Sequence, residues 1–151
     1  MPKSDLEIKK EFEELYKTKD LKIAWDILDE HFERKTKYST LAQDLITTIN
    51  SMVDSQNTEK CAEILEAIIT VPRKRDPRNP QIYRWSADAV YSLRTLAENP
   101  LLDYNQTKIE TLANEFNEKF SDKEYSIGRF SYTSPKTKEI VYINPRQKRV
   151  A

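Results

Sequence analysis

Residues 41–53 read LAQDLITTINSMV, and this stretch decides the fold. Its apolar side chains recur every three or four positions, a period that places them along one face of an α-helix. The helix is expected to start at Ser39 or Thr40, because both residue types suit the N-cap position. The face predicted to be buried consists of Leu41, Ala42, Leu45, Ile46, Ile49, Met52 and Val53.

Helical periodicity continues on both sides of this stretch. Further helices are expected over residues 4–17, 20–32, 58–71, 81–97 and 106–120. A capping box formed by Ser4 and Glu7 favours the first start, and Pro72 ends the fourth helix. The predicted stripe of the first helix is Leu6, Phe12, Leu15 and Tyr16, and that of the second is Leu21, Ala24, Trp25, Leu28, His31 and Phe32. The core is expected to hold Leu45, Ile49, Ile64, Leu65 and Ile68, joined by Trp85 and Leu93.

The C-terminal residues have a different character. Aromatic and β-branched side chains at 125–132 and 140–143 favour strands, and the sequence SPKT at 134–137 suits a turn between them. The apolar positions of the first run change parity across Gly128, which predicts a β-bulge there. We expect a helical domain over 1–120, with a β-hairpin and basic tail over 121–151 packed on it.

The predicted fold class is therefore mainly α: a compact bundle of about six helices, built from helical hairpins, with a C-terminal β-hairpin and a basic tail. Three stacked helical hairpins would also suit a solenoid. No sequence repeat is visible at any fixed period, so the bundle is preferred.

Composition excludes several protein classes. Gly128 is the one glycine of 151 residues, which argues against hairpin-rich sandwiches, Rossmann domains and phosphate-binding P-loops. Cys61 is the one cysteine, so neither an intramolecular disulfide nor a thiolate zinc site within one chain is expected. No apolar run approaches the roughly 20 residues that span a bilayer. We predict a cytoplasmic protein with no membrane partner.

Catalytic groups are scarce. His31 is the single histidine, and the glycine-flanked serine of a nucleophile elbow is absent from the sequence. We interpret His31 as a structural residue and predict that the chain is not an enzyme. We expect no catalytic residues, no metal ligands and no cofactor.

Two acidic pairs are the one sequence feature that would instead indicate an enzyme. Glu11 with Glu14, and Glu30 with Glu33, each follow the pattern E-x-x-E, which places two carboxylates on one helix face. Over less than a quarter of the chain, this resembles the acidic pairs of the all-α nucleotide pyrophosphohydrolases. The second pair of that family ends in Asp, where this chain has Glu33. The resemblance implies a Mg²⁺-dependent nucleotide hydrolase, whereas solvated helix faces are the reading we prefer.

Charge is unevenly distributed in a chain whose net charge is zero. Residues 1–33 carry six Lys and ten Asp or Glu, whereas residues 72–84 carry five Arg or Lys and one Asp. Residues 121–151 carry seven Arg or Lys and three Asp or Glu, so the last two segments are each at +4. The predicted partner-binding residues lie in these two basic segments: Arg73, Lys74, Arg75, Arg78, Tyr83, Arg84, Arg129, Tyr132, Lys136, Lys138, Arg146, Lys148 and Arg149.

Segregated charge and missing catalytic groups favour a protein-interaction role, as an adaptor, assembly subunit, regulator or inhibitor that meets an acidic protein face. The alternative is a protein that binds single-stranded RNA or DNA, because basic groups interleaved with aromatic rings also suit unpaired bases. A third interpretation is that the basic segments neutralise the acidic helices. The oligomeric state is left open.

A four-residue replacement separates the third interpretation from the first two. With Arg73, Lys74, Arg75 and Arg78 replaced by Ser, we expect weaker binding of an anionic partner and a flatter dependence of affinity on salt. The melting temperature should barely change, since surface substitutions usually cost within about 0.5 kcal/mol each. A large loss of thermal stability would instead indicate internal neutralisation.

Overall fold

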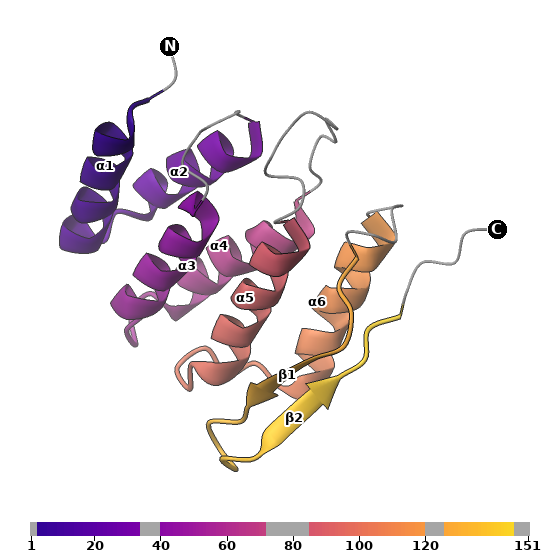
Figure 1. The fold of residues 1–151 in the computed structure, drawn as a ribbon. Coiled ribbons are helices and arrows are strands. Elements are labelled where there is room, and N and C mark those ends of the chain that lie inside the picture. Colours follow the sequence, from indigo (N-terminus) through magenta and orange to yellow (C-terminus); the bar gives the residue numbers. More distant parts are fainter. Residues whose placement is uncertain (1–2, 34–39, 72–84, 120–125, 147–151) are drawn as a thin grey trace.

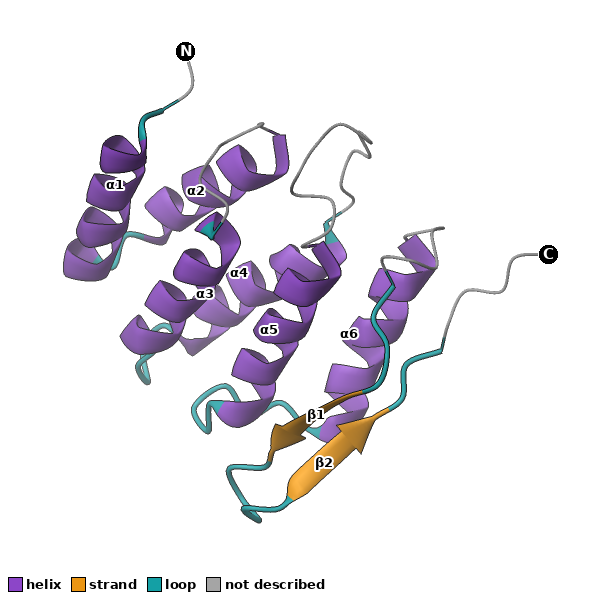
Figure 2. Ribbon diagram, viewed as in Figure 1, coloured by secondary structure: helices purple, strands orange, loops and turns teal. Residues whose placement is uncertain are grey.

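The computed structural model describes residues 3–33, 40–71, 85–119 and 126–146. Six helices and two strands lie in these ranges (Figures 1 and 2). Their bounds are α1 Asp5–Thr18, α2 Leu21–Glu33, α3 Leu41–Met52, α4 Thr58–Thr70, α5 Trp85–Glu98, α6 Gln106–Lys119, β1 Phe130–Thr133 and β2 Ile140–Ile143. The predicted fold class is confirmed: the protein is mainly helical and ends in an antiparallel hairpin.

The helices form two layers (Figure 1). Helices α1, α3 and α5 contact one another in sequence order, and so do α2, α4 and α6. Each helix of one layer also packs on the next helix along the chain, so three helical hairpins stack side by side. Strand β1 packs on α5 and β2 packs on α6, so the hairpin covers the C-terminal end of the stack. None of the described helices is both long and apolar enough to cross a membrane.

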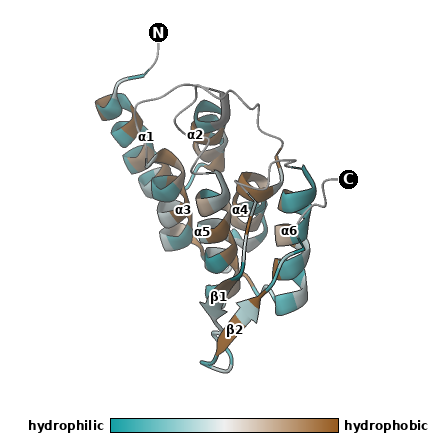
Figure 3. Ribbon diagram, turned by 45° about the vertical axis from the view of Figure 1, so that its right-hand side comes forward, coloured by the Kyte–Doolittle hydropathy of each residue, from teal (hydrophilic) through white to brown (hydrophobic). Residues whose placement is uncertain are grey.

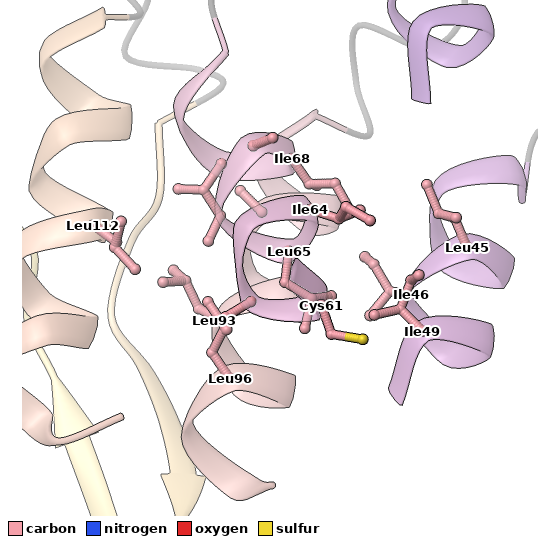
Figure 4. Close-up of a cluster of buried hydrophobic side chains, with 14 of the residues drawn as sticks. Leu45, Ile46, Ile49, Cys61, Ile64, Leu65, Ile68, Leu93, Leu96 and Leu112 are labelled. Carbon is pink, nitrogen blue, oxygen red and sulfur yellow. The ribbon is translucent and has the colours of Figure 1, made fainter. Parts of the chain in front are cut away.

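The core lies between the two layers. Figure 4 shows side chains of α3, α4 and α5 meeting there, among them Leu45, Leu65 and Leu93. All seven residues predicted for the core are buried: Leu45, Ile49, Ile64, Leu65, Ile68, Trp85 and Leu93. Figure 3 shows hydrophilic and hydrophobic segments alternating along the helices, as expected of amphipathic helices with one face on this core.

The predicted stripes of the two N-terminal helices are partly wrong. Leu6 and Tyr16 of α1 are 64% and 58% exposed, and Trp25 of α2 is 37% exposed. Helix α1 lies at the end of the stack and buries Ile8 and Leu15, which are seven residues apart and therefore nearly in line along the helix. An end helix needs only this narrow stripe. Apolar residues that lie outside it remain in solvent.

The predicted β-bulge at Gly128 is also wrong. Strand β1 begins at Phe130, after the glycine, and Gly128 does not have a positive φ. The backbone N–H and C=O of Ile127 are both bonded to the side chain of Asn117 in α6. Because a side chain occupies these groups, the segment before Phe130 does not extend the ladder.

Leucine-to-alanine replacements at two positions test the packing. Leu45 is fully buried between the layers, so Leu45→Ala should lower the free energy of unfolding by about 2–5 kcal/mol. Leu6→Ala makes the same chemical change at an exposed site and should cost within about 0.5 kcal/mol. Urea denaturation measures both. Equal effects of the two replacements would contradict the core described above.

Candidate partner-binding surface

The C-terminal hairpin presents two different faces. In its register Phe130 pairs with Ile143, and Tyr132 pairs with Val141. These four side chains point inward, and three of them belong to the same hydrophobic core as the helices. On the opposite face of β2, Ile140 and Tyr142 are 59% and 54% exposed. The hairpin therefore carries two large, solvent-exposed side chains on one face of a single strand.

The turn of the hairpin is closed by its own backbone. The Ser134 N–H donates to the Glu139 carbonyl at 2.9 Å, and the Lys138 N–H donates to the Ser134 carbonyl at 2.9 Å. Lys138 has a positive φ of 64°, which turns the chain into β2. Lys136 forms an ion pair at 3.0 Å with Asp103, in the connection between α5 and α6. Both side chains are largely exposed, 79% and 74%, so this ion pair contributes little to holding the turn.

Two asparagines of α6 hold the base of the hairpin. The buried Asn117 side chain accepts from the Ile127 N–H at 2.7 Å and donates to the carbonyls of Ile127 and Arg146 at 3.1 and 3.0 Å. Asn114 accepts from the Arg146 N–H at 2.7 Å. Sequence reasoning overlooked both, although Asn117 follows Ala113 by four residues and so falls on the buried face of the helix.

The outer edge of β1 is covered by α5. Arg94 donates from Nε to the Ser131 carbonyl at 2.8 Å, and Glu98 accepts from the Thr133 N–H at 2.8 Å. Both backbone groups point away from β2, so the side chains of α5 occupy the positions that a further strand would use. Arg94 and Glu98 were not predicted, because a charged residue on a helix usually lies on a solvated face.

The outer edge of β2 is different. Ser131 and Thr133 direct their backbone groups away from β2. In an antiparallel pair, the residue opposite such a position also directs its N–H and C=O away from the partner strand. Tyr142 and Ile140, which lie opposite Ser131 and Thr133, therefore have outward backbone groups. None of these backbone groups has a hydrogen-bond partner within the described ranges. Figures 1 and 2 show β1 lying between α5 and β2, so the open edge is the one farther from α5.

Three exposed basic residues belong to the hairpin and its flanking residues. The Arg129 guanidinium lies over the Tyr142 ring, 4.9 Å from its centroid. Arg146 is exposed, with its backbone fixed by Asn114 and Asn117. Lys138 is exposed at the turn. The predicted residues Arg129, Lys138 and Arg146 thus lie along one hairpin, whereas Lys136 is engaged with Asp103.

The remaining predicted residues divide into two groups. Tyr132 is only 6% exposed and belongs to the core, so its ring is not available for stacking on the outer face. Eight predicted residues lie outside the described ranges: Arg73, Lys74, Arg75, Arg78, Tyr83, Arg84, Lys148 and Arg149.

The described residues that flank 72–84 can be placed relative to the hairpin. Lys119 at the end of α6 donates to the Thr70 carbonyl at the end of α4, so the chain leaves α6 beside the point where residues 72–84 begin. The hairpin turn lies at the other end of α6, next to Asp103. Lys136 therefore lies toward the opposite end of α6 from Val71, whereas the Arg146 backbone is bonded to Asn114 and Asn117 near the C-terminal end of α6.

Groups with catalytic potential are buried. His31 of α2 lies 3.3 Å from a carboxylate oxygen of Asp88 in α5, and the two side chains are 1% and 2% exposed. Burial raises the pKa of the Cys61 thiol to about 11, so it is not a thiolate at neutral pH. Among the described side chains, no cluster of three His, Cys, Asp or Glu residues is arranged to hold a metal ion.

The groups gathered along β2 are suited to recognition: open backbone donors and acceptors, exposed apolar side chains and guanidinium groups. No family model matches the chain, and no curated protein or solved structure matches it either.

The asparagine contacts yield a stability prediction. Asn117→Ala removes three hydrogen bonds, to the N–H and C=O of Ile127 and to the Arg146 carbonyl, and a net contribution of about 0.5–1.5 kcal/mol is typical of each. We expect a lower free energy of unfolding and faster amide exchange in β1 and β2. Asn114→Ala removes one exposed contact and should cost much less. Unchanged hairpin protection in Asn117→Ala would contradict the anchoring role.

Proposed function

We propose that this chain is a cytoplasmic, non-enzymatic protein-interaction module, acting as an adaptor, assembly subunit, regulator or inhibitor. Its partner adds an extended segment to the outer edge of β2. The observation that carries the proposal is the pair of residues Ile140 and Tyr142, whose outward backbone groups have no partner in the described chain and whose side chains are exposed.

The contrast between the two hairpin edges supports strand addition. Proteins usually blunt an open strand edge, because such an edge pairs readily with other chains. Here β1 is blunted by Arg94 and Glu98 of α5. No comparable cover lies on β2 within the described residues. Main-chain hydrogen bonds along this edge would supply affinity, and the side chains beside it would supply specificity.

Charge selects the class of partner. Arg129, Lys138 and Arg146 lie along the hairpin, and Glu139 is the one acidic residue of β2 and its turn. An acidic segment is attracted to this surface. A second copy of the chain, paired β2 to β2, would bring its own basic residues against the first set. We therefore favour an acidic protein segment over self-association. The basic segment 72–84 is a further candidate contact.

Single-stranded nucleic acid is the alternative partner. It is favoured by the exposed Arg129–Tyr142 pair, because a cation over an aromatic ring is also a platform for an unpaired base. The burial of Tyr132 removes the second ring that such a platform would use. A net charge of zero also weighs against it, since nucleic-acid affinity depends mostly on phosphate neutralisation.

Fluorescence anisotropy with three labelled probes tests the proposal. The probes are a peptide of alternating Val and Glu, its Val and Lys counterpart, and a single-stranded oligonucleotide of mixed sequence. We expect the Val–Glu peptide to bind best, with an affinity that falls as salt is raised. Preferential binding of the oligonucleotide would favour the alternative, and equal binding of the two peptides would contradict the acidic preference.

Two matched pairs of variants test the backbone contact. Tyr142→Pro removes an outward N–H that the hairpin itself does not use, whereas Tyr142→Ala removes the ring and keeps the N–H. The Val–Glu peptide should bind Tyr142→Pro at least about five-fold more weakly than Tyr142→Ala, the equivalent of one lost hydrogen bond. Ile140→Pro and Ile140→Ala form the second pair. Equal affinities within both pairs, with melting temperatures unchanged, would contradict strand addition.

A further inference from the structure

A pocket of about 350 Å³ lies on the inner side of the hairpin turn, away from the open edge of β2. One wall is the connection between α5 and α6, and the other is the turn with the first residues of β2. Apolar surface dominates the lining, with contributions from Ala97, Pro100, Tyr104, Pro135 and Val141. The volume suits a small organic molecule built around a single ring.

Tyr132 supplies an unused polar group in this pocket. The residue is 94% buried and lines the cavity, yet its hydroxyl has no hydrogen-bond partner among the described residues. Solvent that enters the pocket reaches this hydroxyl, so a bound ligand can reach it as well. Burial also raises the pKa of the phenol, so it stays protonated at neutral pH. The hydroxyl is therefore able both to donate to and to accept from a bound ligand.

The charged groups at the pocket favour a cation. Asp103 and Lys136 neutralise each other across the rim at 3.0 Å. Glu139 also lines the pocket, so the charged residues of the lining are two acids, Asp103 and Glu139, and one base, Lys136; Lys108 acts on Asp103 from outside the lining. The N-terminus of α6 opposes this effect through Asn105 and Gln106, because a helix start favours anions. Its Lys108 N–H is already capped by Asn105, which reduces that contribution.

We propose that this pocket is a binding site for a small organic cation: an apolar ring carrying an amidinium or amine group. The ring lies between the proline and tyrosine side chains of the walls. The cationic head is held by the Glu139 carboxylate and the Tyr132 hydroxyl oxygen, which accepts one of its hydrogen bonds. The site is separate from the partner-binding edge, so neither proposal depends on the other.

Three ligands that share one ring and differ in charge test the assignment. Benzamidine is positive, benzamide neutral and benzoate negative, and each is titrated into the isotope-labelled full-length chain while backbone amide shifts are followed. Benzamidine should bind most tightly and benzoate least, with shifts concentrated at Gln106 and Ser134. Absence of shifts at the pocket with all three ligands would overturn the site. Tightest binding of benzoate would show that the helix start dominates and would overturn the cationic assignment.

Variants assign the two polar contacts. Tyr132→Phe removes only the unpartnered hydroxyl, so the melting temperature should hold while benzamidine affinity falls at least about five-fold. Tyr16→Phe makes the same change on the exposed face of α1 and should alter neither quantity. Glu139→Gln should reduce the preference for benzamidine over benzamide. An unchanged affinity in Tyr132→Phe, or an unchanged preference in Glu139→Gln, would overturn the contact concerned.

Discussion

The buried amide of Asn117 is the interaction on which the placement of the C-terminal hairpin depends. Its oxygen and nitrogen pair with the N–H and C=O of Ile127 as another peptide group would, and the nitrogen also reaches the Arg146 carbonyl. One helical side chain thus fixes the chain both before β1 and after β2. A two-stranded hairpin is marginally stable in water by itself. Anchored at its base and packed on α5 and α6, it becomes part of the core.

Helix α5 determines how the rest of the molecule meets the hairpin. Its inner face donates the Ser92 hydroxyl to the Leu65 carbonyl of α4 and places Asp88 against His31 of α2. Its other side sends Arg94 and Glu98 to the edge of β1. The same helix therefore joins the two layers and closes one hairpin edge. The asymmetry between a covered β1 and an open β2 follows from which strand lies beside α5.

Sequence periodicity correctly identifies the buried residues of a helix that has neighbours on several sides. It fails for a helix that buries only a narrow stripe. Helix α3 packs on several neighbours, so the predicted apolar positions within it are all buried, and Val53, which was also predicted to be buried, follows the helix and is only partly buried. Helix α1 ends the stack, and Leu6 and Tyr16 remain exposed because no further helix covers them. The parity change at Gly128 suggested a bulge, whereas a side chain distant in sequence, Asn117, ends the ladder. Polar contacts across long sequence separations leave no periodic signal.

The contacts at the candidate surfaces were likewise not predictable from the sequence. Basic residues of the hairpin were recognised from composition, but composition does not reveal that Lys136 is paired with Asp103 or that Tyr132 faces inward. Strand alternation separates the two tyrosines of the hairpin: Tyr142 projects beside Arg129, and Tyr132 projects toward the pocket. Because Asn117 holds the base of the hairpin on α6, and Arg94 and Glu98 hold β1 on α5, the hairpin is ordered before a ligand arrives. A preordered strand loses little conformational entropy on binding, which favours the proposed strand addition at an edge of only two residues.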